Sequence, residues 1–307
     1  MNPGSRSGKS KKIFHEIHSF LEHQKISYDY EVTSSLDSAF SLSQQANENN
    51  YDIIVAVGGD GTINKVINGF FDENGKCIST AKFGVIYTGT SPDFCKSYDI
   101  PYKKIDDALR IILVGNTRKI KVGKISLADQ NENVSTKYFA CCANIGLGAT
   151  LARNANRGIR KYFGDNIGTF LSLLKTLKNY RANDFEIQIN GADRTIKKMH
   201  SLSIGMTKYI ASGIKVNHDL QERNFYALIV QNMGLENLPA VLKKIYSGNK
   251  IINDEVVTLD YLDEIEIMKN VQNPEVEFDG DPQGFLPCKI GIAEHELELI
   301  IQDLANG

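Results

Sequence analysis

The chain has 307 residues, of which 42% are hydrophobic and 23% are charged, a composition typical of a globular protein with two domains and a core in each. Its formal net charge of −2 gives no reason to expect a nucleic-acid partner. No stretch approaches the roughly 18 apolar residues that predict a membrane-spanning helix, and the N-terminus has no apolar signal-peptide core.

The N-terminal part predicts two helices with a strand between them. Apolar residues between positions 13 and 21 recur at helical spacing, and alternation over residues 28–32 predicts a strand that ends at Thr33. Ser34 or Ser35 would then cap the second helix, because a serine hydroxyl accepts a hydrogen bond from the first helical turn.

The stretch Ile53–Asn64 carries the strongest signal. The β-branched run Ile53–Val57 predicts a buried strand, which stops at Gly58-Gly59-Asp60-Gly61-Thr62. The glycines allow a sharp turn and let an oxyanion approach main-chain N–H groups, and a helix predicted over 63–70 adds the positive end of its dipole. Asp60 fits this loop if a divalent cation accompanies the phosphates, because Mg²⁺ takes carboxylate and phosphate oxygens together. The loop therefore predicts a metal–nucleotide site, although similar patterns also occur in purely structural turns.

Strands and helices continue to alternate after this loop. Lys82–Tyr87 predicts a strand, Thr88–Phe94 a second polar turn, and the apolar residues from Ile105 to Ile112 a helix. Because strands that alternate with helices form parallel sheets, the first part of the chain is predicted to be a doubly wound, mainly parallel α/β domain.

After Gly115 the pattern changes to strands in succession. Alternation over residues 185–189 leads into Asn190-Gly191, which is a type I′ hairpin signal. The other strands are predicted at 120–127, 138–143, 202–206, 225–231, 257–260 and 265–268, with helices near 167–177 and 238–246. This part is predicted to be a mainly antiparallel β-sandwich domain.

These patterns define two predicted domains. The α/β domain comprises residues 1–118 together with a last strand in 296–307 that returns to it, and the β-sandwich domain comprises residues 119–295. The five cysteines lack CxxC spacing, which favours reduced, mostly buried thiols in a cytoplasmic protein over disulfides or a zinc site.

Two carboxylates flank a glycine near the C-terminus, in the run Asp279-Gly280-Asp281. Carboxylates that lie close together raise one another's pKa, which suits a general base that works near neutral pH. The alternative is that Asp279-Gly280 is a hairpin turn with solvated acids, and the segment alone does not separate the two.

Five motifs are distributed over nearly the whole chain. They are Asn2-Pro3-x-Ser5, Gly58-Gly59-Asp60-Gly61-Thr62-x-Asn64, Gly89-Thr90-x-x-Asp93-Phe94, the Asn144-x-Gly146-x-Gly148 turn and Asp279-Gly280-Asp281. In order and approximate spacing they resemble the diacylglycerol kinase catalytic domain family, which includes bacterial soluble lipid kinases and the sphingosine and ceramide kinases. The GGDGT core alone is shared with NAD kinases and phosphofructokinases.

The resemblance implies an ATP-dependent lipid kinase that phosphorylates a hydroxyl of diacylglycerol or a related lipid, with ATP bound between the domains. It implies a nucleotide site formed by Asn2, Ser5, Thr33, Gly58, Gly59, Asp60, Gly61, Thr62, Asn64 and Thr90. It also implies that Asp60 and Asp93 organise Mg²⁺, and that Asp281 takes the proton from the lipid hydroxyl with Asp279 beside it. In-line phosphoryl transfer relies mostly on positioning and on neutralisation of charge.

The chain departs from the family pattern at several positions. The strand that usually runs into Asn-Pro is missing, Pro92 replaces the usual asparagine before Asp93, and Lys121 replaces an aspartate of the metal–water network. Glu222-Arg223-Asn224 stands where several bacterial members hold a structural Mg²⁺, and a cation in place of a ligand predicts that this metal site is lost. Asp281 is one methylene shorter than the usual glutamate, which would move the base by about 1 Å.

These departures motivate the alternative of a catalytically impaired relative that binds nucleotide or lipid without turnover. A third interpretation is an NAD-kinase-like enzyme, against which the second domain and the Asp279–Asp281 turn count. The resemblance implies a lipid substrate and peripheral binding at the inner face of a membrane, whereas the oligomeric state, including a homodimer, is left open. The basic residues of 144–166 would either meet anionic headgroups or form a solvated helix face.

Overall fold

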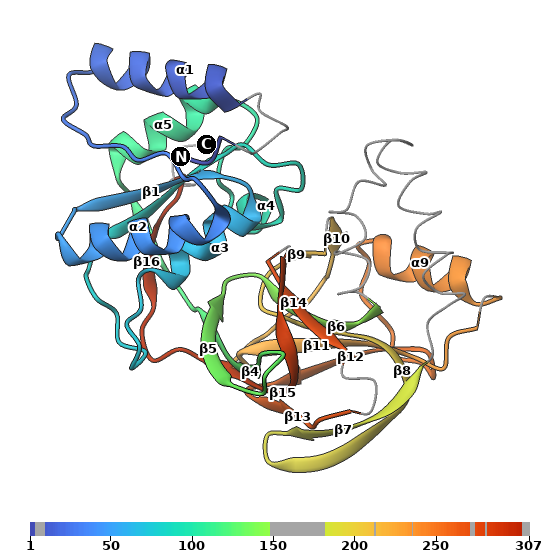
Figure 1. Cartoon of the computed structure of the whole chain (residues 1–307). Helices are drawn as coiled ribbons and strands as arrows, with labels where there is room; N and C mark the ends of the chain where they lie inside the picture. Colours follow the sequence, from blue (N-terminus) through green and yellow to red (C-terminus); the bar gives the residue numbers. More distant parts are fainter. Residues whose placement is uncertain are drawn as a thin grey trace. The chain divides into compact units, whose positions relative to one another are not determined.

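The structure is a computed structural model that describes residues 1–3, 10–147, 182–211, 213–234, 236–270, 274–279 and 281–302. The chain divides into two compact units, Met1–Val122 with Ala293–Gly307, and Gly123–Ile292. Each unit has a main β-sheet of its own (Figure 1).

The sheet of the N-terminal unit has the strand order β1-β2-β16-β3 within the described residues. Its strands are β1 (Ile53–Gly58), β2 (Lys82–Tyr87), β16 (Leu297–Ile300) and β3 (Thr117–Ile120). The first three run parallel, and β3 pairs antiparallel with β16. Leu299 of β16 pairs with Phe83 of β2, and both side chains are fully buried. The last strand of the chain therefore completes the core of the first unit.

Helices cover both faces of this sheet (Figure 1). On one face lie α1 (Ser10–His23) and α5 (Ile105–Val114), and on the other α2 (Leu36–Glu48) and α3 (Asp60–Asn68). A buried cluster joins Ile17 of α1 and Leu109 of α5 to Val57 of β1. The predicted parallel α/β domain is thus confirmed.

The predicted cap of α2 is confirmed, whereas the predicted strand before it is wrong. The Ser35 hydroxyl accepts a hydrogen bond from the first turn of α2. Residues 28–32 form no strand, because a strand needs a ladder of backbone hydrogen bonds to a neighbouring strand. This segment is instead held at its end by Met1: the terminal amine of Met1 donates to the carbonyl of Glu31, and the N–H of Thr33 donates to the carbonyl of Met1.

The second unit is built from antiparallel strands (Figure 1). In chain order its elements are β4 (Gly123–Ala128), β5 (Val134–Phe139), β6 (Cys142–Gly146), β7 (Asn183–Ile189), β8 (Ala192–Gly205), β9 (Tyr209–Ile210), β10 (Ile214–Lys215), β11 (Phe225–Gln231), α9 (Leu238–Tyr246), β12 (Val257–Leu262), β13 (Ile265–Ile267), β14 (Glu275–Phe278) and β15 (Asp281–Ile292). The strands β8-β6-β14-β15-β13-β7 close a ring, because β7 also pairs with β8.

Two long strands of this ring, β8 and β15, allow it to close, because each changes partner along its length. β8 pairs with β7 through its first half and with β6 through its second half. β15 pairs with β14 at its start and with β13 and β4 further along. The ring surrounds a buried cluster that includes Phe278, Leu202 and Phe185. The prediction of an antiparallel, sandwich-like second domain is confirmed.

Local turns in this unit differ in how well they were predicted. Asn190 and Gly191 have φ values of 49° and 80° and join Ile189 directly to Ala192, which confirms the type I′ hairpin. The strand predicted over 138–143 is wrong, because residues 140–141 separate β5 from β6. Of the turn predicted over 144–148, residues 144–146 lie within the strand β6 and form no turn. Gly148 and the helix predicted near 167–177 fall outside the described residues.

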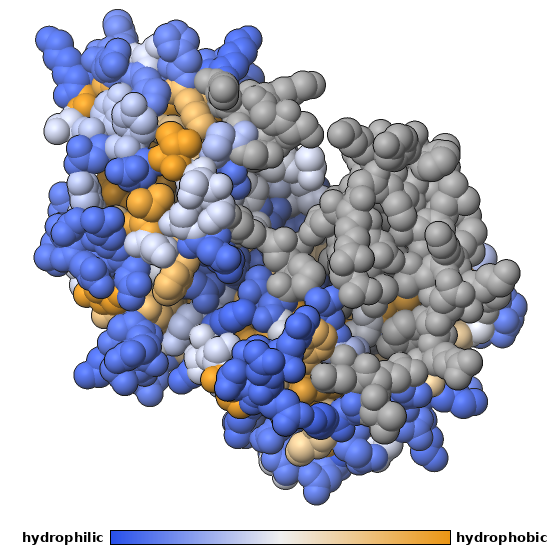
Figure 2. All heavy atoms as spheres, viewed as in Figure 1, coloured by the Kyte–Doolittle hydropathy of each residue, from blue (hydrophilic) through white to orange (hydrophobic). Residues whose placement is uncertain are grey.

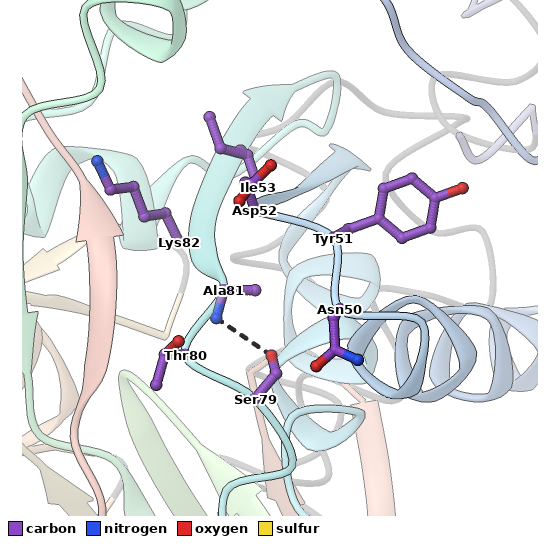
Figure 3. Close-up of a pocket in the computed structure, with 8 residues that line it drawn as sticks. All are labelled: Asn50, Tyr51, Asp52, Ile53, Ser79, Thr80, Ala81 and Lys82. Carbon is purple, nitrogen blue, oxygen red and sulfur yellow. Dashed lines mark hydrogen bonds between the residues drawn. The ribbon is translucent and has the colours of Figure 1, made fainter.

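A surface pocket of about 350 Å³ lies at the amino ends of β1 and β2 (Figure 3). It is lined by residues 50–53 and 79–82, and the Ala81 N–H donates to the Ser79 hydroxyl within it. Because open α/β sheets bind ligands at the carboxyl ends of their strands, this pocket is at the wrong end for the predicted nucleotide.

Figure 2 shows a surface that is largely hydrophilic, with hydrophobic side chains exposed in separate patches. Exposed large hydrophobic residues of the N-terminal unit include Ile26, Val32 and Val114. Among the residues that the structure describes, no helix is both long and apolar enough to cross a membrane.

Candidate functional site

β1 ends in glycines because neighbouring atoms leave no room for side chains. A Cβ on Gly58 would lie 2.4 Å from the Cβ of Thr62, and a Cβ on Gly59 would lie 3.2 Å from the Cα of Gly89. Gly59 is extended and directly precedes α3, which begins at Asp60 and hence earlier than predicted. The glycine-rich turn is therefore tightly packed and opens at once into a helix.

The turn after β2 lies against the turn after β1. The Thr88 N–H donates to the Gly58 carbonyl at 2.8 Å, and a Cβ on Gly89 would lie 2.7 Å from the Cα of Gly59. Both turns follow the carboxyl ends of neighbouring parallel strands, which is where sheets of this kind bind ligands. The two backbones lie in contact where a phosphate could approach main-chain N–H groups, with the Thr62 and Tyr87 hydroxyls beside them.

A carboxylate stands where each turn becomes a helix. Asp60 is the first residue of α3, and the buried Asp93 is the first residue of α4 (Asp93–Ser97). One oxygen of Asp60, Oδ2, accepts a hydrogen bond from the Tyr87 hydroxyl at 2.8 Å, and Oδ1 accepts one from the Phe94 N–H at 3.4 Å. Asp60 is thus joined to the end of β2 and to the helix that begins at Asp93.

Tyr87 was missed by the sequence analysis. It is the last residue of β2, and it is buried. Burial and the neighbouring Asp60 charge raise the pKa of its hydroxyl well above the usual value, so the hydroxyl keeps its proton and remains a donor. The signal available in the sequence was a hydroxyl-bearing aromatic residue placed at the strand end, directly before the second turn.

The structure brings together two of the predicted site residues from distant parts of the chain. The Asn2 side-chain amide donates to the Thr62 hydroxyl at 2.9 Å. Thr33 is placed less directly, because its N–H bonds to the carbonyl of Met1, the residue before Asn2. Ser5 lies outside the described residues.

The remaining predicted positions of the N-terminal unit differ in exposure. Asn64 is buried in α3, where its carbonyl accepts a hydrogen bond from the Asn68 side chain. Gly61 is half-buried in the first turn of the same helix, and Thr90 is exposed on the second turn. The site therefore combines buried and half-buried residues of α3 with an exposed threonine on the second turn.

In the second unit Phe278 of β14 pairs with Asp281 of β15, so Asp279 lies in a turn between two antiparallel strands. The hairpin of the alternative interpretation is thus confirmed, whereas its solvated acids are wrong for Asp279. Asp279 is buried, and its carboxylate accepts hydrogen bonds from the N–H groups of Ala140 at 2.9 Å and Cys141 at 3.1 Å. It ties the turn to the connection between β5 and β6. Asp281 follows as the first residue of β15, and Gly280 lies outside the described residues.

A second group of buried polar side chains lies in the same sheet. The Asn144 amide donates to Glu277 Oε2 at 2.7 Å, and the Ser203 hydroxyl donates to Asn144 Oδ1 at 2.6 Å. These residues belong to the neighbouring strands β6, β14 and β8, and their exposed fractions are only 2%, 3% and 7%. Periodicity could not identify this network, because its members meet only when the strands pair.

The structure describes the surroundings of three residues that depart from the family pattern. Pro92 occupies the N-cap of α4 and makes no side-chain hydrogen bond there. Lys121 is exposed between β3 and β4. The Arg223 guanidinium forms an ion pair with Asp263, whose other oxygen accepts the Asn224 N–H at 3.1 Å.

Comparisons with known families agree with the two-unit architecture. A family model described as the diacylglycerol kinase catalytic domain matches residues 1–125. A second model, the YegS C-terminal NAD kinase beta sandwich-like domain, matches residues 142–301, more than half of the chain. The chain belongs to the diacylglycerol kinase-like family. The family that the sequence motifs predicted is therefore confirmed.

Individual members of this diacylglycerol kinase-like family match over most of their length. A diacylglycerol kinase of Staphylococcus aureus (strain MRSA252) is 25% identical over 318 residues, which cover 99% of this chain and 92% of that protein. A solved diacylglycerol kinase structure from Bacillus anthracis str. Sterne has a TM-score of 0.61 and 18% identity, covering 89% of this chain and 84% of that one. Another structure from the same organism has a TM-score of 0.73 and 19% identity, covering 98% and 95%. These structures share the fold.

Proposed function

We propose that the chain is an ATP-dependent lipid kinase that transfers the γ-phosphoryl group of ATP to a hydroxyl of diacylglycerol or a related lipid. The observation that carries the proposal is the contact between the two turns, where Gly59 and Gly89 bring their backbones together at the carboxyl ends of β1 and β2. Membership of a family of diacylglycerol kinase-like proteins supports the lipid as acceptor.

The residues around the two turns fit a nucleotide. Extended backbone at Gly59 and the first turn of α3 offer N–H groups and the positive end of a helix dipole to the phosphates. Beside this floor, the residues that would contact the nucleotide are Asn2, Ser5, Thr33, Gly58, Gly61, Thr62, Asn64 and Thr90. In this proposal the Asn2–Thr62 hydrogen bond fixes the N-terminal segment beside the loop.

The same region fits a magnesium ion that arrives with ATP. Within the described residues no group of three or more His, Cys, Asp or Glu side chains could hold a metal by itself. Asp60 and Asp93 are oxygen donors beside the proposed phosphate floor, and Mg²⁺ characteristically takes one or two carboxylates together with phosphate oxygens. When bound, the ion would neutralise charge on the transferring phosphoryl group.

Asp281 would act at the acceptor hydroxyl. Its carboxylate would take the hydroxyl proton while the lipid oxygen forms a bond to the γ-phosphorus and the bond to the leaving ADP oxygen breaks. Asp279 would support this step by holding the turn, since its carboxylate is bonded to two backbone N–H groups. We propose peripheral binding at the inner face of a membrane from the cytoplasm, because the acceptor is a lipid.

The test is a phosphate-transfer assay on the whole chain with labelled ATP, Mg²⁺ and a panel of lipids that includes diacylglycerol, with NAD as a soluble acceptor. We expect transfer to a lipid, and its loss in Asp281→Asn with ATP binding retained. Asp193→Asn is the matched control, because Asp193 also lies near the start of a strand after a two-residue turn. Labelling of NAD in place of every lipid would overturn the proposal.

A second candidate function is ATP binding without turnover, and Pro92 favours it. An N-cap asparagine would accept a hydrogen bond from the first turn of α4, whereas Pro92 makes no such bond beside Asp93. This candidate predicts thermal stabilisation by ATP with no labelled product from any acceptor. Detectable turnover would exclude it.

A further inference from the structure

We propose that Tyr87 is a positioning residue of the candidate nucleotide site, and that its hydroxyl holds the Asp60 carboxylate in the orientation that receives Mg²⁺ with ATP. The inference rests on the proposed binding of ATP and adds a residue that neither the family motifs nor the sequence pattern assigned.

The first argument is the way in which Asp60 is held. Asp60 begins α3, yet both of its carboxylate oxygens bond to groups beyond that helix. The Tyr87 hydroxyl, at the end of β2, donates to Oδ2 at 2.8 Å, whereas the Phe94 N–H, in α4, donates to Oδ1 at the longer distance of 3.4 Å. A hydrogen bond to a carboxylate is stronger when it is short, so the bond from Tyr87 is the stronger of these two.

The second argument is the space that the second turn leaves for Tyr87. A Cβ on Gly89 would lie 2.5 Å from the Tyr87 hydroxyl oxygen and 2.7 Å from Cζ of the same ring. The phenol therefore folds back over the turn and occupies the place that a side chain at position 89 would need. Because Gly89 has no side chain, both the Gly59 backbone and the Tyr87 hydroxyl can pack against it.

The third argument is chemical. Each carboxylate oxygen of Asp60 accepts one of these hydrogen bonds, and an ionised carboxylate oxygen can accept a hydrogen bond and contact a cation at the same time. Groups that orient a metal-binding carboxylate from behind commonly change metal affinity by about 10- to 100-fold when they are removed. Tyr87 orients the Asp60 carboxylate in this way through its hydrogen bond. A phenylalanine at position 87 would keep the packing of the ring and remove only the hydrogen-bond donor.

The experiment compares ATP binding by calorimetry in excess Mg²⁺ and in EDTA, with full-length wild type and Tyr87→Phe. We expect the affinity for ATP in Mg²⁺ to fall by on the order of tenfold in Tyr87→Phe, while the affinity in EDTA stays at the wild-type value. Tyr226→Phe is the matched control: it removes another buried hydroxyl, which donates to a backbone carbonyl at 2.8 Å in the second unit. For Tyr226→Phe, the ratio of the ATP affinity in Mg²⁺ to the ATP affinity in EDTA should equal that of the wild type.

Asp60→Asn should lower the same ratio, and adding Tyr87→Phe to it should cause little further loss, because both substitutions act on one carboxylate. If wild type binds ATP more tightly with Mg²⁺ and Tyr87→Phe leaves the ratio unchanged, the role of Tyr87 is overturned while the proposed function stands. An equal loss in Mg²⁺ and in EDTA also overturns it, since a general packing defect would have that effect. A wild-type protein that binds no ATP overturns the proposed function together with this inference.

Discussion

Gly59 and Gly89 pass each other so closely that a Cβ on Gly89 would lie 2.7 Å from the Cα of Gly59. The two glycines follow neighbouring parallel strands, and each is placed by its own strand. The contact explains why both turns contain glycine: a side chain at either position would separate them. It also makes the geometry of the candidate site sensitive to a single methyl group.

Gly89→Ala is therefore expected to damage the site. The new Cβ would overlap both Gly59 and the Tyr87 hydroxyl, and overpacking of this kind costs about 1–3 kcal/mol of unfolding free energy. ATP affinity, measured by calorimetry, should fall as the turns separate. Urea denaturation measures the loss of unfolding free energy. The control is Gly291→Ala, where nothing lies within 4 Å of the added Cβ. Wild-type ATP affinity in Gly89→Ala would show that the backbone contact does not form the site.

Asp279→Asn is expected to destabilise the second unit. An asparagine tolerates the φ of 48° at this turn, but it offers one oxygen where two backbone N–H groups now find acceptors. One of these two buried N–H groups loses its acceptor on residue 279. The free energy of unfolding, measured by urea titration, should therefore fall by about 1–3 kcal/mol. Asp129→Asn is the control, because Asp129 is exposed and both of its backbone N–H bonds reach the single oxygen Oδ1, which an asparagine would keep. Equal losses for the two variants would contradict the argument.

The buried Asn144 network is expected to behave as one unit. Ser203→Ala removes the donor to Asn144 Oδ1 and should lower the unfolding free energy by about 1–2 kcal/mol. Combined with Asn144→Ala, it should cost less than the sum of the single losses, because the bond between them is lost only once. Strict additivity in this double-mutant cycle would show that the network is not coupled. Ser126→Ala, in an exposed pair with Thr136, should be nearly neutral.

His218 is expected to make the fold sensitive to acid. Burial beside the Tyr226 ring, followed by the charge of Lys208, lowers its pKa from the ordinary 6.5. The unfolded chain therefore binds this proton below pH 6.5 before the folded chain does, so stability is retained above that pH and falls as the pH drops through the folded pKa. The difference in urea midpoint between about pH 7.5 and 5.5 should shrink in His218→Asn. The same difference should persist in His23→Asn, an exposed control on α1. An unchanged difference in His218→Asn would refute this assignment.

Features fixed by adjacent residues were predictable from the sequence. The β-branched run before Gly58 formed β1, Ser35 capped α2, and Asn190-Gly191 made the hairpin, because each depends on the conformational preferences of a few neighbours. The family motifs then gave the order of the two units. Local chemistry and long-range architecture agreed at these positions.

The errors and omissions arose where distant residues decide the outcome. Residues 28–32 alternate like a strand but find no ladder of partners. The break between β5 and β6 is held by Asp279, which lies 139 residues beyond Ala140. The bond between Tyr87 and Asp60 likewise joins two strand ends that become neighbours only when the parallel sheet forms. Periodicity along the chain carries no information on such contacts.

The position of β16 between β2 and β3 has a consequence for biosynthesis. The chain leaves its first unit after Val122 and re-enters it at Ala293. As the nascent polypeptide emerges from the ribosome, the α/β sheet therefore lacks an inner strand until residues 297–300 are made, whereas the described strands of the intervening unit are already available. Domains usually fold in the order of their synthesis, but in this chain the unit that starts first is expected to finish last.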